Sequence, residues 1–207
     1  MSKNRSGTSV VQSAIDIKSW MQRQPTVEET RPSRCPKCGA ASHPLGNSIQ
    51  LHGHGTRGRD VLHPAHPGGP ATSFLLPARR YRCVPCRAVI VVVPREVRGR
   101  RLYSASAIGL ALALWGLVLA TAAEVRRRVC PAKILGPAAA TGWATLRRWA
   151  RAVARGHLFA STPTPDSTAP LRRAAALAAA ALAACADPTT RGLAIEHRAL
   201  LGAAQVT

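Results

Sequence analysis

Two Cys-x-x-Cys pairs constrain this chain more than any other feature of its sequence. The first pair lies in CPKCG, residues 35–39, and the second in CVPCR, residues 83–87. Each pair can present two thiolates from one tight turn, and two such turns can enclose a tetrahedral zinc ion. We therefore predict one structural Zn²⁺ bound by Cys35, Cys38, Cys83 and Cys86. Because four thiolates leave no open position for water, the predicted role is structural and not catalytic.

The stretch between the two pairs is unusually long for a compact site of this kind. It spans residues 39–82, which is 44 residues, whereas roughly 15–20 are typical. We predict a turn-rich loop insertion over residues 58–73 that accounts for the excess. A mixed Cys/His site or a second metal stays open, but four thiols already complete a tetrahedron, so ordinary loop or strand positions are favoured for the histidines. These are His43, His52, His54, His63 and His66.

The remaining cysteines and the N-terminal residues indicate the compartment. Cys130 and Cys185 are isolated in the sequence, and we interpret them as small buried hydrophobic residues. Residues 1–30 lack the continuous apolar run of a secretory signal. We expect a cytoplasmic, nucleoid-associated protein in a reducing environment, where a structural metal is favoured over a disulfide framework.

Positive charge is concentrated in the middle of the chain. The net charge is +20, from 29 Lys and Arg against 9 Asp and Glu, and residues 31–160 contribute +18 of it. A solvated surface without a partner would mix basic and acidic residues more evenly. A basic block of this kind points to a polyanion, most simply double-stranded DNA.

The order of patterns along the chain predicts an α+β protein. We expect a small N-terminal Cys₄ zinc ribbon with a short β-sheet, followed by an all-α, helix-turn-helix-like domain. The ribbon would use strands at 48–52, 74–83 and 88–93. The predicted segments are a flexible N-terminus with a short helix (1–30, the helix at 10–22), the ribbon (31–98), the helical domain (99–160), and a linker with C-terminal helices (161–207).

An amphipathic helix is predicted over residues 142–155, with Thr141 as its N-cap. Its apolar residues fall at helical spacing and form one buried stripe. Its arginines fall outside this stripe, which is typical of a helix that enters the major groove and equally of a solvated surface helix. The basic neighbourhood at 126–128 favours DNA. The stripe consists of Trp143, Leu146, Trp149, Ala150 and Val153, and the arginines are Arg147, Arg148, Arg151 and Arg155.

An uncharged run at residues 104–123 leaves a second architecture open. Twenty residues without a charge match the length of a membrane span, and arginines flank the run on both sides. The run is rich in Ala, however, and such segments are weak spans. A buried first helix of the helical domain is favoured over a membrane anchor.

Residues for catalysis are not visible in the sequence. The nine carboxylates form no acidic cluster, and the chain has neither a Gly-rich phosphate loop nor a nucleophile elbow. We therefore predict a protein that is not an enzyme.

Several of these motifs together resemble the N-terminal region of bacterial insertion-sequence transposases, a zinc ribbon coupled to a helix-turn-helix, and small bacterial proteins made of that region. The matching motifs cover about residues 31–155. They are the CPKCG knuckle at 35–39, His52-Gly53 with Arg57 and Arg59, the RRYRC run at 79–83, the start of a helix at Tyr103-Ser104, and LRRW at 146–149.

The resemblance implies a DNA-targeting module and places its contacts on the ribbon and the arginine-bearing helices. Residues 156–207 are too short and too poor in acids for the nuclease domain of such transposases, so cleavage is not carried over. A separate transposase or nuclease subunit stays open as a partner, and so does a second copy of the chain in a homodimer. The alternatives to a DNA-binding function are a membrane-anchored zinc ribbon and a zinc-dependent module that binds protein or RNA. The implied DNA contacts are Arg57, Arg59, Arg80, Arg82, Arg126, Arg127, Arg147, Arg148 and Arg151.

Overall fold

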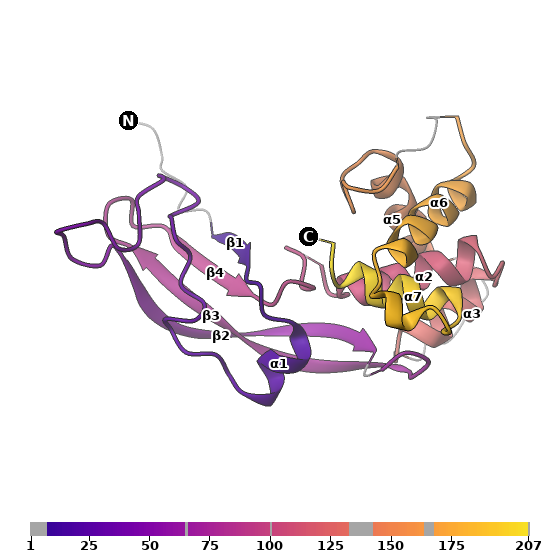
Figure 1. Cartoon of the computed structure of the whole chain (residues 1–207), viewed down its shortest axis with the longest axis horizontal. Helices are drawn as coiled ribbons and strands as arrows, with labels where there is room; N and C mark the ends of the chain where they lie inside the picture. Colours follow the sequence, from indigo (N-terminus) through magenta and orange to yellow (C-terminus); the bar gives the residue numbers. More distant parts are fainter. Residues whose placement is uncertain (1–7, 65, 100, 133–142, 164–167, 207) are drawn as a thin grey trace. The chain divides into compact units, whose positions relative to one another are not determined.

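The chain divides into two compact units in the structure, a computed structural model that describes residues 8–64, 66–99, 101–132, 143–163 and 168–206. The first unit combines the chain up to Asp60 with Leu75–Arg101, and the second combines Val61–Phe74 with Leu102–Thr207. A long strand hairpin therefore contributes to both units, and Figure 1 shows the strands and the helices.

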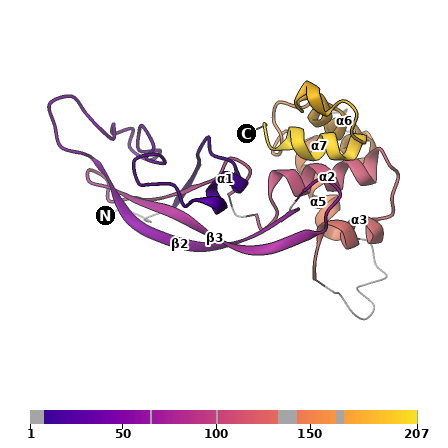
Figure 2. The same cartoon turned by 60° about the horizontal axis from the view of Figure 1, so that its bottom comes forward.

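A four-stranded sheet runs through the first unit. Its strands are β1 (Ser9–Gln12), β2 (Leu51–Pro64), β3 (Ala71–Cys83) and β4 (Val89–Val93). The spatial order is β1-β4-β3-β2, with β1 parallel to β4 and β3 antiparallel to it (Figure 1). Figure 2 shows β2 and β3 from another side. A short helix, α1 (Ile17–Gln22), follows β1 and is capped by the carboxylate of Asp16.

The register of β3 and β4 separates two faces of the sheet. Tyr81 is aligned with Ile90, whereas Arg80 is aligned with Val91 and Arg82 with Val89. Since successive side chains of a strand point to opposite faces, Arg80 and Arg82 lie on the face opposite Tyr81.

The segment around α1 covers the face that bears Tyr81. The indole Nε1 of Trp20 donates to the carbonyl of Pro77 at 3.1 Å, and the Tyr81 hydroxyl donates to the carbonyl of Val27 at 2.6 Å. Thr30 Oγ1 lies 2.7 Å from the same hydroxyl, and both Trp20 and Tyr81 are fully buried. The N-terminal segment therefore covers the face that bears Tyr81. On the opposite face Arg82 is exposed, whereas Val91 and Val93 are buried.

The predicted architecture of the first half was wrong. A small N-terminal ribbon with a short sheet was expected. Instead, the long strands β2 and β3 occupy residues 51–83, which include most of the loop predicted at 58–73. The cysteines lie at 35–38, before β2, and at the end of β3. Strand β2 contains Gly and His residues of low β-propensity, and its pairing with β3 outweighs that local preference. The helix expected at 10–22 is likewise divided into β1 and the shorter α1.

The second unit is mainly helical. Contrary to the all-α prediction, it also contains the end of the β2–β3 hairpin. There Leu62 N–H donates to the carbonyl of Leu102 at 2.8 Å, and Ser104 N–H donates to the carbonyl of Leu62 at 2.9 Å. Its helices are α2 (Ala105–Gly116), α3 (Ala122–Val129), α5 (Ala144–Ala154), α6 (Leu171–Ala184), the 3₁₀ helix η1 (Pro188–Thr190) and α7 (Ile195–Ala203).

The apolar stripe predicted for the arginine-bearing helix is confirmed. All five of its residues are buried, and the helix begins at Ala144 after Trp143; the predicted cap, Thr141, lies outside the described residues. Trp143, Trp149 and Tyr103 form a cluster of three edge-on ring contacts with centroids 4.9 to 5.8 Å apart. Such contacts add to the stability from buried area, so the cluster holds α5 against the start of α2.

Glycine and alanine allow α2, α6 and α7 to approach closely (Figures 1 and 2). A Cβ on Gly202 of α7 would lie 1.7 Å from the carbonyl oxygen of Leu182 in α6, and one on Gly116 of α2 would lie 2.4 Å from the amide nitrogen of Ala176. These backbones therefore touch where any larger residue would separate them.

The uncharged run at 104–123 does not form one continuous helix. Helix α2 ends at Gly116 after 12 residues, and α3 begins at Ala122. Within the described residues, none of the helices combines the length and the apolar character that crossing a membrane requires.

Replacing Gly202 by Ala should lower the stability of the helical unit, although Ala normally favours a helix by about 1 kcal/mol. The new methyl group would overlap the carbonyl of Leu182, so we expect a loss of about 3 kcal/mol and a fall in Tm of roughly 6–12 °C. Thermal unfolding by circular dichroism measures the change. Gly192→Ala is the control, because nothing lies within 4 Å of a Cβ there; an unchanged Tm for G202A would contradict the close packing.

Candidate metal centre

Four sulfur atoms from the two Cys-x-x-Cys pairs come together in the first unit. Cys35 Sγ lies 3.7 Å from Cys86 Sγ, and Cys38 Sγ lies 3.6 Å from Cys83 Sγ. All four lie within 4.8 Å of one another, so this cluster could hold a metal ion. Since each close pair takes one sulfur from each turn, an ion here would link the two turns to each other.

The first turn, residues 35–39, is closed by its own backbone. Cys35 N–H donates to the carbonyl of Ala40 at 2.8 Å, and Gly39 N–H donates to the carbonyl of Cys35 at 2.9 Å. The N–H of Lys37 points to the Cys35 sulfur, with N and Sγ 3.4 Å apart. A backbone N–H directed at a sulfur stabilises the thiolate form that metal binding requires.

The second turn, residues 83–87, repeats these bonds at equivalent positions. Cys83 N–H donates to the carbonyl of Ala88 and Arg87 N–H to that of Cys83, both at 3.0 Å. In addition, Val84 N–H donates to the carbonyl of Gln50 at 2.9 Å, immediately before β2. The second turn is therefore anchored both to the end of β3 and to the start of β2.

The two turns share a left-handed backbone position but fill it with different residues. Gly39 has a φ of 75°, which glycine adopts freely, whereas Arg87 has a φ of 60°. A residue with a Cβ is strained there by about 1 kcal/mol or more. The side chain of Arg87 is exposed.

Environment separates the acidities of the cysteines. Burial opposes ionisation of Cys35, but the backbone N–H groups of Cys38 and Lys37 outweigh it and lower the pKa of the Cys35 thiol to about 7. Burial and, to a smaller extent, the neighbouring thiols together raise the pKa of the Cys83 thiol to about 12. Bringing all four to the thiolate form therefore needs the charge of a bound cation, and binding should release protons.

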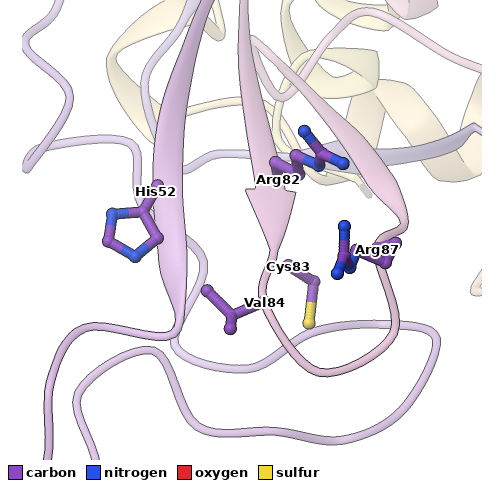
Figure 3. A pocket seen from close by; sticks show the side chains of 5 residues that line it. All are labelled: His52, Arg82, Cys83, Val84 and Arg87. Carbon is purple, nitrogen blue, oxygen red and sulfur yellow. The ribbon is translucent and has the colours of Figure 1, made fainter.

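A pocket of about 340 Å³ lies beside the second turn, and Figure 3 shows the side chains around it. Arg82 and Arg87 lie on one side of Cys83 in this view, and His52 and Val84 on the other. Arg82, Arg87, His52 and Val84 are all exposed, so the pocket is open to solvent.

The arginines predicted to contact DNA in the first unit differ in their environments. Arg57 and Arg82 are exposed and Arg80 is half-buried. Arg59 is also half-buried, and its guanidinium donates to the carbonyls of Arg98 and Arg101, the latter at 3.0 Å. Arg59 therefore supports the fold locally, and burial lowers the pKa of its guanidinium.

The predicted arginines of the second unit lie on α3 and α5. Both helices bury an apolar side, Val125 and Val129 in α3 and the stripe described above in α5. The arginines on the outer side of α5 are exposed, as is Arg127 of α3, whereas Arg126 is half-buried. The exposed arginines of α5 are Arg147, Arg148, Arg151 and Arg155.

Sequence analysis overlooked Arg87. It follows the second Cys-x-x-Cys pair at the position where Gly39 follows the first, and this mismatch was the available signal. Among the described residues no other group of three or more His, Cys, Asp or Glu side chains could hold a metal. Cys130 is half-buried and Cys185 exposed, so the expected burial of Cys185 was wrong.

No family model, curated protein or solved structure matches this chain.

Purified protein should contain one metal ion per chain. The substitution Cys83→Ser should abolish metal binding, because a serine hydroxyl is a poor replacement for a thiolate ligand. Elemental analysis of the protein after gel filtration measures the ratio. Cys185→Ser is the control, since Cys185 lies outside the cluster and should leave the ratio at one. Equal metal content in the two variants would show that the four sulfurs do not hold the ion.

Proposed function

We propose that this chain is a zinc-stabilised DNA-binding protein, a transposase-like targeting module that carries out no catalysis. The observation that carries the proposal is the cluster of four sulfurs within a strongly basic part of the chain. Residues 31–103, which contain the cluster, hold 13 basic and 2 acidic residues.

Zinc is the metal that the cluster supports best. Four sulfurs at about 2.3 Å from a tetrahedral Zn²⁺ are about 3.8 Å apart. The close sulfur pairs here are 3.6 and 3.7 Å apart, so an ion needs only a small adjustment of the side chains. Cys35, Cys38, Cys83 and Cys86 would be its ligands, and a full set of thiolates supplies cross-linking, not catalysis.

The exposed arginines predicted to contact DNA support a polyanionic partner because, within the described residues, none of them forms an ion pair with a carboxylate. The ion pairs found among the described residues join Arg23 to Glu29, and Arg31 and His43 to Glu28. All of these lie outside the predicted DNA contacts. Unpaired guanidinium groups attract phosphate and release its counterions on binding.

Helix α5 offers the best surface for contact with a groove. Arg147 and Arg151 are four residues apart and share one side of the helix, with Arg148 beside them. The opposite side of α5 is anchored in the core by Trp149 and Leu146. A rigid helix that presents several arginines fits the major groove, where arginine contacts both phosphates and guanine.

The zinc-loaded protein should bind duplex DNA with an affinity that falls steeply as salt rises. Replacing Arg147, Arg148 and Arg151 together by Ala should remove about three phosphate or base contacts and flatten the slope of log K against log salt by up to about 3. Fluorescence anisotropy with a labelled duplex between 50 and 200 mM salt measures both slopes, and metal content should stay at one ion per chain.

A charge-matched control replaces Lys18, Arg173 and Arg191 by Ala. These three side chains are exposed and lie outside the predicted contacts, so their loss should change the slope less. If both triple variants behave alike, net charge and not α5 determines binding. If RNA or an acidic peptide binds as tightly as duplex DNA, the DNA assignment fails and an interaction module replaces it.

A further inference from the structure

We infer that the pocket beside the second Cys-x-x-Cys turn is a phosphate-binding subsite, which receives one phosphodiester group of a bound nucleic acid. The inference rests on the proposed function and adds a location and a chemistry to it. The subsite, called the knuckle pocket below, is lined by Arg82, Arg87, His52, Val84 and the metal-site cysteine Cys83.

The cations of the knuckle pocket are held on well-anchored backbone. Arg82 is exposed and is paired with Val89 of β4, on the face of the sheet opposite Tyr81. Arg87 belongs to a turn whose N–H groups bond back to Cys83 and, through Val84, to Gln50. Arg82 and Arg87 thus line the same open pocket from positions that a bound metal would fix further (Figure 3).

The chemistry of the knuckle pocket suits a phosphodiester better than a free small molecule. In the described part of the chain, the guanidinium groups of Arg82 and Arg87 have neither a hydrogen-bond nor an ionic partner. Guanidinium binds phosphate oxygens in a bidentate manner. Val84 and the ring of His52 add an apolar side against which the adjoining sugar can pack, and about 340 Å³ is near the lower end of ligand pockets, which span roughly 300–1,000 Å³.

The backbone strain at Arg87 is an independent argument. The equivalent position in the first turn holds Gly39, and a glycine at 87 would relieve the strain. Within the described residues, the Arg87 side chain makes no hydrogen bond or ion pair that would compensate for it. Strain of this kind is retained where the side chain has a role outside the fold.

Neutralising the metal centre is the competing role for these arginines. A divalent ion with four thiolates carries a net charge of −2, and a nearby guanidinium would stabilise it. The two roles differ in what they predict, because a neutralising arginine strengthens metal binding whether or not nucleic acid is present.

Arg87→Gly separates the two roles, since it removes the guanidinium and relaxes the backbone. We expect one zinc per chain and an unchanged zinc affinity in competition with a chelator. The affinity for duplex DNA should fall about tenfold, and the salt slope should flatten by about one. Arg82→Ala, which leaves the turn itself intact, should weaken binding similarly, and Lys18→Ala, an exposed cation of the same unit, should have little effect.

The outcomes distinguish this inference from the function on which it rests. If wild-type protein binds DNA and both R87G and R82A bind within twofold of it, the subsite is wrong and the proposed function stands. If R87G loses zinc affinity but binds DNA normally at saturating zinc, the arginine serves the metal and the subsite is again wrong. If the wild-type protein binds no nucleic acid, the proposed function and the subsite both fail.

Discussion

The four-sulfur cluster is the contact on which the basic end of the sheet depends. It joins cysteines that are 45 and 51 residues apart in the chain. Closing such long loops costs conformational entropy, and burial offsets only part of this cost because Cys35 and Cys83 are buried, whereas Cys38 is exposed and Cys86 half-buried. Within the described residues, no backbone hydrogen bond joins the two turns directly. A metal ion bound by all four thiolates would supply the missing link, since metal binding at such sites contributes directly to folding.

A second interaction determines which face of the sheet the N-terminal segment covers. Trp20, Val27 and Thr30 all contact the face around Tyr81, and this N-terminal segment carries most of the acidic residues of its unit. The carboxylates are thereby kept with the covered face, where Glu28 and Glu29 pair with neighbouring arginines. On the opposite face, within the described residues, Arg80 and Arg82 form no such ion pair.

Local patterns were predictable from the sequence, and long-range pairing was not. The four cysteines, the Val-rich strand β4 and the apolar stripe of α5 each follow from spacing within a few residues. Strand β2 does not, because Gly53, Gly55 and Gly58 are typical of a loop and become a strand only through pairing with β3. Parallel strand β1 also depends on a partner about 80 residues away, which no local pattern reveals.

The two Cys-x-x-Cys turns are equivalent in backbone yet differ in what they present to solvent. Both bond the fifth residue back to the first cysteine, and both place that fifth residue in the left-handed region. If metal binding were their sole function, glycine would serve equally well in both, as Gly39 does in the first turn. The second turn holds an arginine instead, and it is the turn anchored to both β2 and β3, so its position relative to the sheet is the better defined of the two. A cation that must meet a phosphate at a fixed distance from other cations gains most from that position. The strain of Arg87 and the anchoring of its turn therefore support the same assignment, in which one turn completes the metal centre and the other also contributes to the binding surface.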